Sequence, residues 1–265
     1  MLRTIAELGI GTCPEDQPCA VRDSVIAPHV HVCVTGNGCV LLDLRRDKYL
    51  GLGRRETEVL AATISEWPQP TWDHVGDSMG VDSTQAEADE LCRGLVADGI
   101  LVPARDDRVG PANRPLPKMQ RDWISIGDEL EVPGRIHPRD VATFMAAFVW
   151  ARGSLSLRPF WMTVESVRAS KSRGRGAVVV GDILDLAARV DVFRRLRPFL
   201  FAAEDRCLLH ALTLLRFLRR YGFYPEWVIG VATQPWGAHS WVQWGDFLLD
   251  SNPEKVCRYT PIMMV

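Results

Sequence analysis

The chain has 265 residues, of which 47% are hydrophobic and 24% charged, and its formal net charge is -2. This length is enough to bury a core in one or two domains. No apolar run approaches the roughly 20 residues of a bilayer-spanning helix, and the chain does not open on a secretion signal. Because the seven cysteines are also odd in number, we expect a cytoplasmic protein with reduced thiols rather than a disulfide framework.

The charges are unevenly distributed, which indicates two domains. Residues 1–105 carry 9 Lys or Arg against 16 Asp or Glu, whereas residues 106–265 carry 22 against 17. Neither excess is large enough to predict nucleic acid as the main partner. Together with the positions of proline, the charges divide the chain into an N-terminal arm (1–27), a first domain (28–105), a proline-rich linker (106–136) and a second domain (137–265).

The first domain is predicted to contain three strands and three helices, in a winged-helix-like arrangement. Strict alternation in HVHVCVT, a turn at 36–38 and the returning CVLLDL predict a hairpin with Val30 and Val32 facing Val40 and Leu42. The elements predicted after it are a strand KYLGL (48–52), helices at 56–67, at 72–79 and from a cap at Asp82 or Ser83 to Gly99, and a closing strand ILVP.

The second domain is predicted to be α+β. Helices are expected over 139–151 and 183–200, with a basic loop at 168–175 that lacks the glycine spacing of a phosphate-binding loop. A nearly all-apolar helix follows from Arg206 to Tyr221, and then strands WVIGV, AHSWVQW and FLLD. Such a helix belongs at the centre of a domain.

Cys207 is the first catalytic candidate because it falls in the first turn of that central helix, with Asp205 as the expected N-cap. Free backbone N–H groups and the helix dipole there favour a thiolate and an oxyanion. Taken alone, a small buried hydrophobic cysteine is the commoner interpretation. His210, three residues later, is an alternative base, but its place on a stripe with Arg216 suggests a solvated residue.

A histidine and a carboxylate follow at the spacing of one hairpin. His239 lies in AHSWVQW, and a two-residue turn at 245–246 leads into FLLD. In that register Asp250 is the diagonal neighbour of His239, and Asn252 lies directly opposite as a fallback. Cys207, His239 and Asp250 would then act as nucleophile, base and orienting carboxylate. The Cys207 N–H would be one oxyanion donor, with Gln234 a candidate for the second.

The segment DRCLLHALTLLRFLRRYGFYPEWVIGV and then GAHSWVQWGDFLLDSNPEKV resembles the C-terminal protease of lasso-peptide maturation. This family has a papain-like or transglutaminase-like cysteine protease fold and removes the leader from a ribosomally made precursor. The resemblance covers about 205–256. It implies a Cys207–His239–Asp250 triad, no cofactor, and partnership with an ATP-dependent macrolactam synthetase.

The first domain resembles the peptide-recognition element that is similar to the small chaperone of pyrroloquinoline quinone biosynthesis. The match covers about 28–103 and rests on V-L-L-D-L at 40–44, a basic turn at 45–47 and Y-L-G-L at 49–52. Such elements bind a leader as an added strand on the third strand, against the third helix. The leader-binding residues implied are Lys48, Tyr49, Leu50, Leu52, Leu91 and Leu95.

The sequence thus predicts a leader peptidase, and two other functions stay open. The same triad serves acyl transfer to amines, as in transglutaminases and arylamine acetyltransferases, and a non-catalytic chain could present the precursor to another enzyme. No metal site is expected. The alternation predicts that His29, His31 and Cys33 are outward-facing strand residues, and the spacing of Cys13 and Cys19 is not that of a zinc pair.

Overall fold

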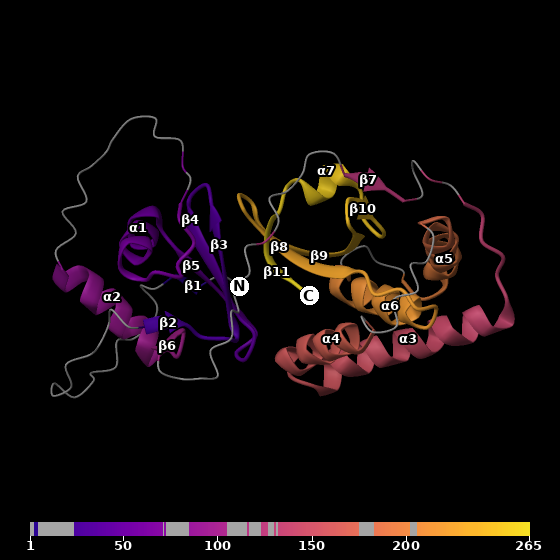
Figure 1. The fold of residues 1–265 in the computed structure, drawn as a ribbon, viewed down its shortest axis with the longest axis horizontal. Helices are drawn as coiled ribbons and strands as arrows, with labels where there is room; N and C mark the ends of the chain where they lie inside the picture. The colour runs from indigo at the N-terminus through magenta and orange to yellow at the C-terminus, as the bar shows by residue number, and fades with distance from the viewer. Residues whose placement is uncertain are drawn as a thin grey trace. The chain divides into compact units, whose positions relative to one another are not determined.

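The computed structural model describes residues 3–4, 24–70, 72, 85–104, 116, 123–126, 130, 132–174, 183–201 and 206–265. The chain separates into two compact units, Met1–Leu116 and Pro117–Val265. Both units combine helices with a sheet (Figure 1). Within the described residues, no helix has the length and apolar content to cross a membrane.

The first unit is built on a four-stranded sheet in the order β1-β5-β4-β3. The predicted hairpin and the strand KYLGL are confirmed, and a helix follows them, but it spans residues 54–63 instead of the predicted 56–67. The elements are β1 (Arg3–Thr4), β2 (Ser24–Ile26), β3 (Val30–Thr35), β4 (Gly38–Asp43), β5 (Lys48–Leu52), α1 (Arg54–Thr63), α2 (Gln85–Ala97) and β6 (Leu101–Pro103), which pairs with β2. Of the predicted helix at 72–79 only Trp72 is described, and it is not helical; residues 73–79 and the cap at Asp82 or Ser83 lie outside the described residues.

The hairpin register differs by one residue from the prediction. Thr35 faces Gly38, so the turn has two residues instead of three, and Val32 faces Leu41. Gly38 has φ +137°, and a Cβ atom there would lie 2.0 Å from the Leu52 carbonyl oxygen, so only glycine fits. The one-residue change moves every side chain of the returning strand to the other face.

His31 and Cys33 are not outward-facing, as the sequence suggested. They are 5% and 6% exposed, and burial raises the pKa of the Cys33 thiol to about 12. The hairpin is buried on both faces, and alternation in sequence could not reveal this because both sets of side chains are apolar or neutral. Among the described residues, His, Cys, Asp and Glu form no group able to hold a metal ion.

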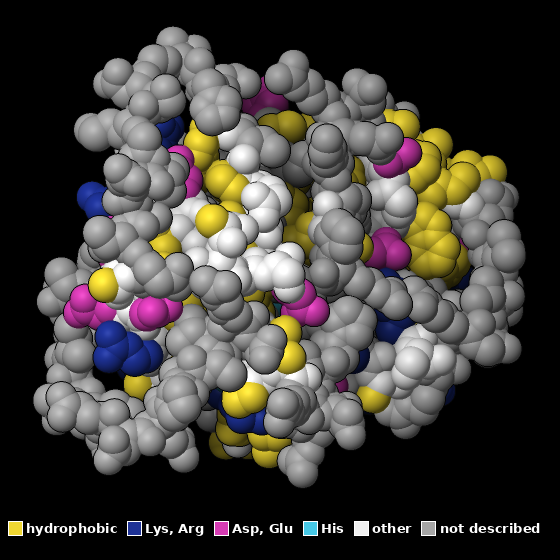
Figure 2. All heavy atoms as spheres, turned by 60° about the vertical axis from the view of Figure 1, so that its left-hand side comes forward, with side chains coloured by type: hydrophobic (Ala, Val, Ile, Leu, Met, Phe, Trp, Pro, Cys, Tyr) yellow, Lys and Arg dark blue, Asp and Glu magenta, His cyan; other side chains and the backbone are white. Residues whose placement is uncertain are grey.

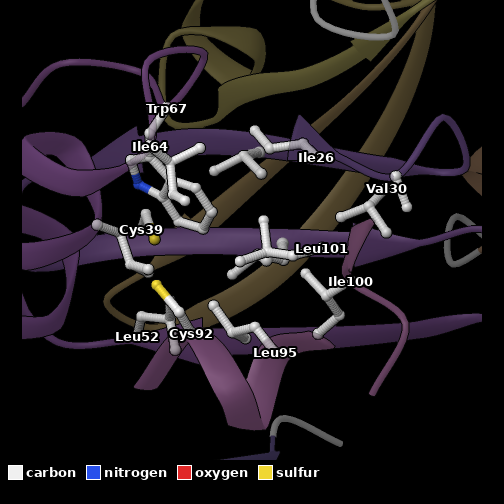
Figure 3. Packing of buried hydrophobic residues seen from close by; sticks show 14 residues of the cluster. Ile26, Val30, Cys39, Leu52, Ile64, Trp67, Cys92, Leu95, Ile100 and Leu101 are labelled. Carbon is white, nitrogen blue, oxygen red and sulfur yellow. The ribbon is translucent and has the colours of Figure 1, made fainter. Parts of the chain in front are cut away.

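The core of the first unit lies between the sheet, α1, α2 and the β2–β6 pair (Figure 3). Leu52 and Leu95, two of the predicted leader-binding residues, are 5% and 2% exposed and belong to this core. Leu50 and Leu91 are half-buried and pack against it. Lys48 is exposed and Tyr49 half-buried. Leu52 and Leu95 therefore stabilise the unit instead of facing a ligand.

The second unit has a five-stranded sheet in the order β11-β8-β9-β10-β7. Its elements are β7 (Ile124–Ser125), α3 (Pro138–Leu157), α4 (Phe160–Gly174), α5 (Ile183–Leu196), η4 (Arg197–Phe199), α6 (Cys207–Arg219), β8 (Glu226–Thr233), β9 (Trp236–Trp244), β10 (Phe247–Leu248), α7 (Pro253–Val256) and β11 (Thr260–Met264). The central helix and the β8–β9 pair are confirmed.

Three parts of the second unit differ from the prediction. The helix α4 runs through the predicted loop at 168–175, because serine and arginine are tolerated in a helix that ends at Gly174. β7 lies inside the predicted linker and pairs in parallel with β10. The short α7 and the strand β11 were not predicted, although β11 supplies one edge of the sheet.

Within this unit, α6 lies between the sheet and α3 (Figure 1). A buried polar group fixes the two helices: Asp140 of α3 accepts hydrogen bonds from the Tyr221 hydroxyl, just beyond α6, and from the His137 N–H. Burial alone would raise the pKa of Asp140, but these bonds and the nearby Arg189 guanidinium hold it below its ordinary value. The ionised carboxylate therefore holds the start of α3 against the end of α6.

On the face shown in Figure 2, the described residues present acidic and basic side chains interspersed with hydrophobic ones. Two of the described ion pairs are Arg55 with Glu87 at 2.7 Å, and Arg168 with Glu165 at 2.7 Å. Exposed pairs of this kind contribute little to stability.

Candidate active site

Cys207 is the first residue of α6, where backbone N–H groups have no intrahelical partner. Its side chain is half-buried, whereas most of the helix behind it is buried. The N-cap is Arg206, whose side chain makes no capping hydrogen bond, and the predicted cap, Asp205, lies outside the described residues. The thiol is thus held at a partly accessible helix N-terminus, where the helix dipole favours negative charge.

His239 lies in the middle of β9, opposite Gly230 of β8, and is 5% exposed. A Cβ atom on Gly230 would lie 2.8 Å from the Trp241 ring and 3.0 Å from Cβ of Tyr259. Both aromatic rings pack against the imidazole, with centroid separations of 6.1 Å for Trp241 and 5.3 Å for Tyr259. Glycine at 230 therefore leaves the space in which these rings enclose His239.

Burial lowers the pKa of His239 to about 4, and the charge of Lys255 acts in the same direction. Asp250 raises this pKa and His210 lowers it, so both side chains are near enough to act on the ring. The imidazole is consequently neutral at pH 7, the form that accepts a proton. Its Nε2 atom lies 3.1 Å from Oγ of Ser251.

Asp250 follows the point where β9 and β10 stop pairing. The predicted two-residue turn is present, and Gln243 faces Leu248. One more backbone bond follows, from the Leu249 N–H to the Val242 carbonyl at 3.0 Å, and the Asp250 carboxylate then takes over, with Oδ1 accepting the Val242 N–H at 2.8 Å. The paired residues keep the predicted register, but β10 ends at Leu248, so Asp250 and Asn252 are not strand partners of β9.

The second oxygen of Asp250 faces α6 instead of His239. Oδ2 lies 3.3 Å from Nδ1 of His210, and the two side chains are 2% and 11% exposed. Sequence reasoning placed His210 on a solvated stripe, and this was wrong. Spacing offered one clue, since residues three apart on a helix are neighbours and His210 lies one turn from Cys207.

Asn252 and Gln234 have other positions. Asn252 is the N-cap of α7, and its side chain accepts the Lys255 N–H at 2.9 Å, so it does not face His239. Gln234 is exposed in the turn between β8 and β9. It precedes His239 by five residues and lies outside the paired part of the two strands, and as an oxyanion donor it stays a prediction.

The predicted leader-binding edge carries a strand of the chain itself. β1 pairs in parallel with β5, with Arg3 opposite Leu50 and Thr4 opposite Gly51. The prediction assigned residues 1–27 to an arm outside the domain, so this pairing could not be foreseen. An added strand from a ligand would need the same backbone groups of β5.

The arrangement provides a nucleophile, a base and a fixed carboxylate from three separate elements. A half-buried thiol at a helix N-terminus has N–H groups beside it that can stabilise an oxyanion. The imidazole on β9 is buried and neutral, the form of histidine that can accept a proton. These are the groups required for acyl transfer through a thioester, with either water or an amine as the acceptor.

Comparison with known proteins identifies the same part of the chain. Residues 142–264 match the family described as the transglutaminase-like superfamily. Cys207, His239 and Asp250 all lie inside this match, and the first unit lies outside it. Neither the curated proteins nor the solved structures contain a match. The chain therefore has a transglutaminase-like domain over residues 142–264.

Proposed function

We propose that the chain is a cysteine peptidase that removes the leader from a lasso-peptide precursor, and that it acts in the cytoplasm. The observation that carries the proposal is the combination of Cys207 at the head of a buried helix with a neutral, buried His239 in a transglutaminase-like domain. The resemblance of residues 205–256 to lasso-peptide proteases supplies the substrate class. The resemblance of residues 28–103 to a peptide-recognition element supplies the means of holding a leader.

In the proposed reaction, His239 takes the Cys207 proton as sulfur attacks the scissile carbonyl. The carbonyl oxygen becomes negative and is stabilised by N–H groups at the start of α6, including that of Cys207. The carbon–nitrogen bond then breaks, and the imidazolium returns its proton to the departing amine of the core peptide. Water, deprotonated by His239, cleaves the thioester, which releases the leader carboxylate and restores the thiol.

Leader binding is assigned to the edge of β5. Lys48, Tyr49 and Leu50 lie on that strand, with Lys48 exposed and Tyr49 and Leu50 half-buried. Because β1 pairs with the same edge, the leader would displace β1 or extend beyond it. Backbone pairing would give affinity, and the side chains would give selectivity.

The products suggest the partner. Hydrolysis needs no cofactor, and it frees an amine at the first core residue. Condensing that amine with a carboxylate requires activation of the carboxylate, so an ATP-dependent macrolactam synthetase would follow this step. The proposed peptidase and that synthetase would act on the same precursor.

Incubation of the precursor with the wild type and with Cys207→Ala tests the proposal. We expect mass spectrometry to show free leader and core with the wild type and intact precursor with the variant. Equal cleavage by both proteins would refute a cysteine peptidase. Added primary amine distinguishes acyl transfer, because an aminated leader in place of the free acid would identify an amine acceptor. Leader binding by both proteins without cleavage would identify a carrier.

A further inference from the structure

His210 occupies a site where an apolar residue would be expected. Its side chain is 11% exposed, and its ring packs against Phe193 and Phe201 with centroid separations of 5.3 Å to each. A polar ring in such surroundings costs free energy unless it makes a compensating polar contact. The imidazole at this position therefore calls for an explanation beyond packing.

Only one nitrogen of this ring has a polar neighbour among the described residues. Nδ1 lies 3.3 Å from Oδ2 of Asp250, whereas Nε2 is buried without a hydrogen-bond partner in the same part of the chain. Since the Asp250 side chain is 2% exposed, water screens this contact weakly. The ring is thus directed at the carboxylate, and the tautomer with its proton on Nδ1 presents a donor to it.

Asp250 connects His210 to the strand that carries His239. Its Oδ1 atom holds the Val242 N–H, three residues beyond His239 on β9. The next residue in the chain, Ser251, contacts Nε2 of His239. A shift of Asp250 would therefore move both the end of the β9 ladder and the hydroxyl that faces the imidazole.

We propose that His210 is a positioning residue of the active site. It holds the Asp250 carboxylate between α6 and β9, and through Asp250 and Ser251 it fixes the His239 ring relative to Cys207. This inference rests on the proposed peptidase function. It assigns no proton transfer to His210, whose Nε2 is buried and without a partner among the described residues.

Three variants at α6 test the assignment in the full chain. His210→Phe keeps a ring between Phe193 and Phe201 but removes the donor, and kcat for precursor cleavage should fall about 10- to 100-fold with KM unchanged. His210→Asn restores an N–H donor near Nδ1 and should recover most of that loss. Thr213→Val is the matched control, because it removes a buried hydroxyl that donates to the Leu209 carbonyl of the same helix, and it should leave kcat unchanged.

Coupling to Asp250 separates positioning from a general effect on folding. In an Asp250→Asn background, adding His210→Phe should lower kcat by less than twofold, because its route to His239 is already broken. A full additional loss would overturn the inference, as would a wild-type kcat in His210→Phe. Circular dichroism establishes that each variant folds, and if His210→Phe does not, the comparison of His210→Asn with Thr213→Val decides.

The pH profile provides a second readout, besides the rate at one pH. The groups that act on His239 are Lys255 of α7, Asp250 and His210, with Tyr259 packed against the ring. His210 is one of the groups that lower the pKa of His239, so His210→Phe should move the acid limb of kcat/KM to higher pH. An unmoved limb would overturn the inference.

Histidine-labelled protein tests the pairing without any activity. The ring ¹⁵N signals of His210 should change in Asp250→Asn, and unchanged signals would overturn the inference. Changed signals in a protein that does not cleave the precursor would instead refute the peptidase proposal and support the His210–Asp250 pairing.

Discussion

The pKa of His239 makes a quantitative prediction for the pH dependence of cleavage. A general base must be neutral to act, and the acid limb of kcat/KM reports its pKa in the free enzyme. With a pKa of about 4, about 90% of the imidazole is neutral at pH 5. A histidine at the ordinary value of 6.5 would be only about 3% neutral there. We therefore expect kcat/KM at pH 5 to stay close to its value at pH 7.

The assay is initial-rate cleavage of the precursor between pH 3.5 and 8, at substrate concentrations well below KM. An acid limb with its midpoint near pH 6.5 would refute the reasoning, because it would mean that water or a counter-charge reaches the imidazole. The precursor also titrates in this range, so its binding to Cys207→Ala should be measured at each pH. Only a change in cleavage that is not matched by a change in binding reports on His239.

The same pKa predicts a loss of stability in acid. The folded state resists protonation of His239 while the unfolded state takes up a proton below pH 6.5. Neutral His239 therefore contributes about 3 kcal/mol to the free energy of unfolding. This contribution is complete above pH 6.5 and is lost as the pH falls through 4. Urea unfolding of the wild type and of His239→Gln at pH 7 and pH 4 measures this difference. The pH-rate profile is interpretable only where the wild type remains folded.

Three further perturbations test separate parts of the structure. Gly230→Ala places a methyl group 2.8 Å from the Trp241 ring, so it should lower the unfolding free energy by about 1–3 kcal/mol and also lower kcat. Wild-type values of both quantities would show that the aromatic rings around His239 do not fix it. Lys255→Gln removes the charge that helps to lower the pKa of His239, and the acid limb should move to higher pH in the same assay, whereas a shift to lower pH would contradict the assignment. A chain starting at Ser24 lacks β1 and should bind a synthetic leader more tightly by titration calorimetry, and unchanged affinity would place the leader away from β5.

Local pattern was sufficient for the elements that determine the fold. The alternating hairpin, the strand KYLGL and the apolar helix of Cys207 each carry a strong period, and the structure contains all three. The hairpin register failed because Gly36, Asn37 and Gly38 permit a turn of either two or three residues. Strands such as β1 and β7 are two residues long, too short for any period, and exist only because another strand edge pairs with them.

The same distinction applies to the site. Cys207 and His239 could be found from sequence because a helix start and an alternating strand place them without reference to anything distant. Ser251 and Tyr259 could not, since they reach the imidazole through α7 and its flanking turns, which have no pattern of their own. The need for glycine at 230 could not be predicted either, because it arises from the Trp241 ring on the neighbouring strand.

Asp250 shows why residue order alone does not define a triad. Two histidines lie near Asp250: His239 on β9 and His210 on α6, the helix that carries Cys207. Which of them Asp250 contacts depends on where the pairing of β9 and β10 ends. Its last backbone bond is that of the Leu249 N–H with the Val242 carbonyl, and beyond it the Asp250 side chain holds the Val242 N–H with one oxygen and faces α6 with the other. His239 then receives the field of the carboxylate without a direct bond to it, and Ser251 makes the direct contact. The low pKa of His239 is consistent with this arrangement, because a bonded carboxylate would offset burial more fully.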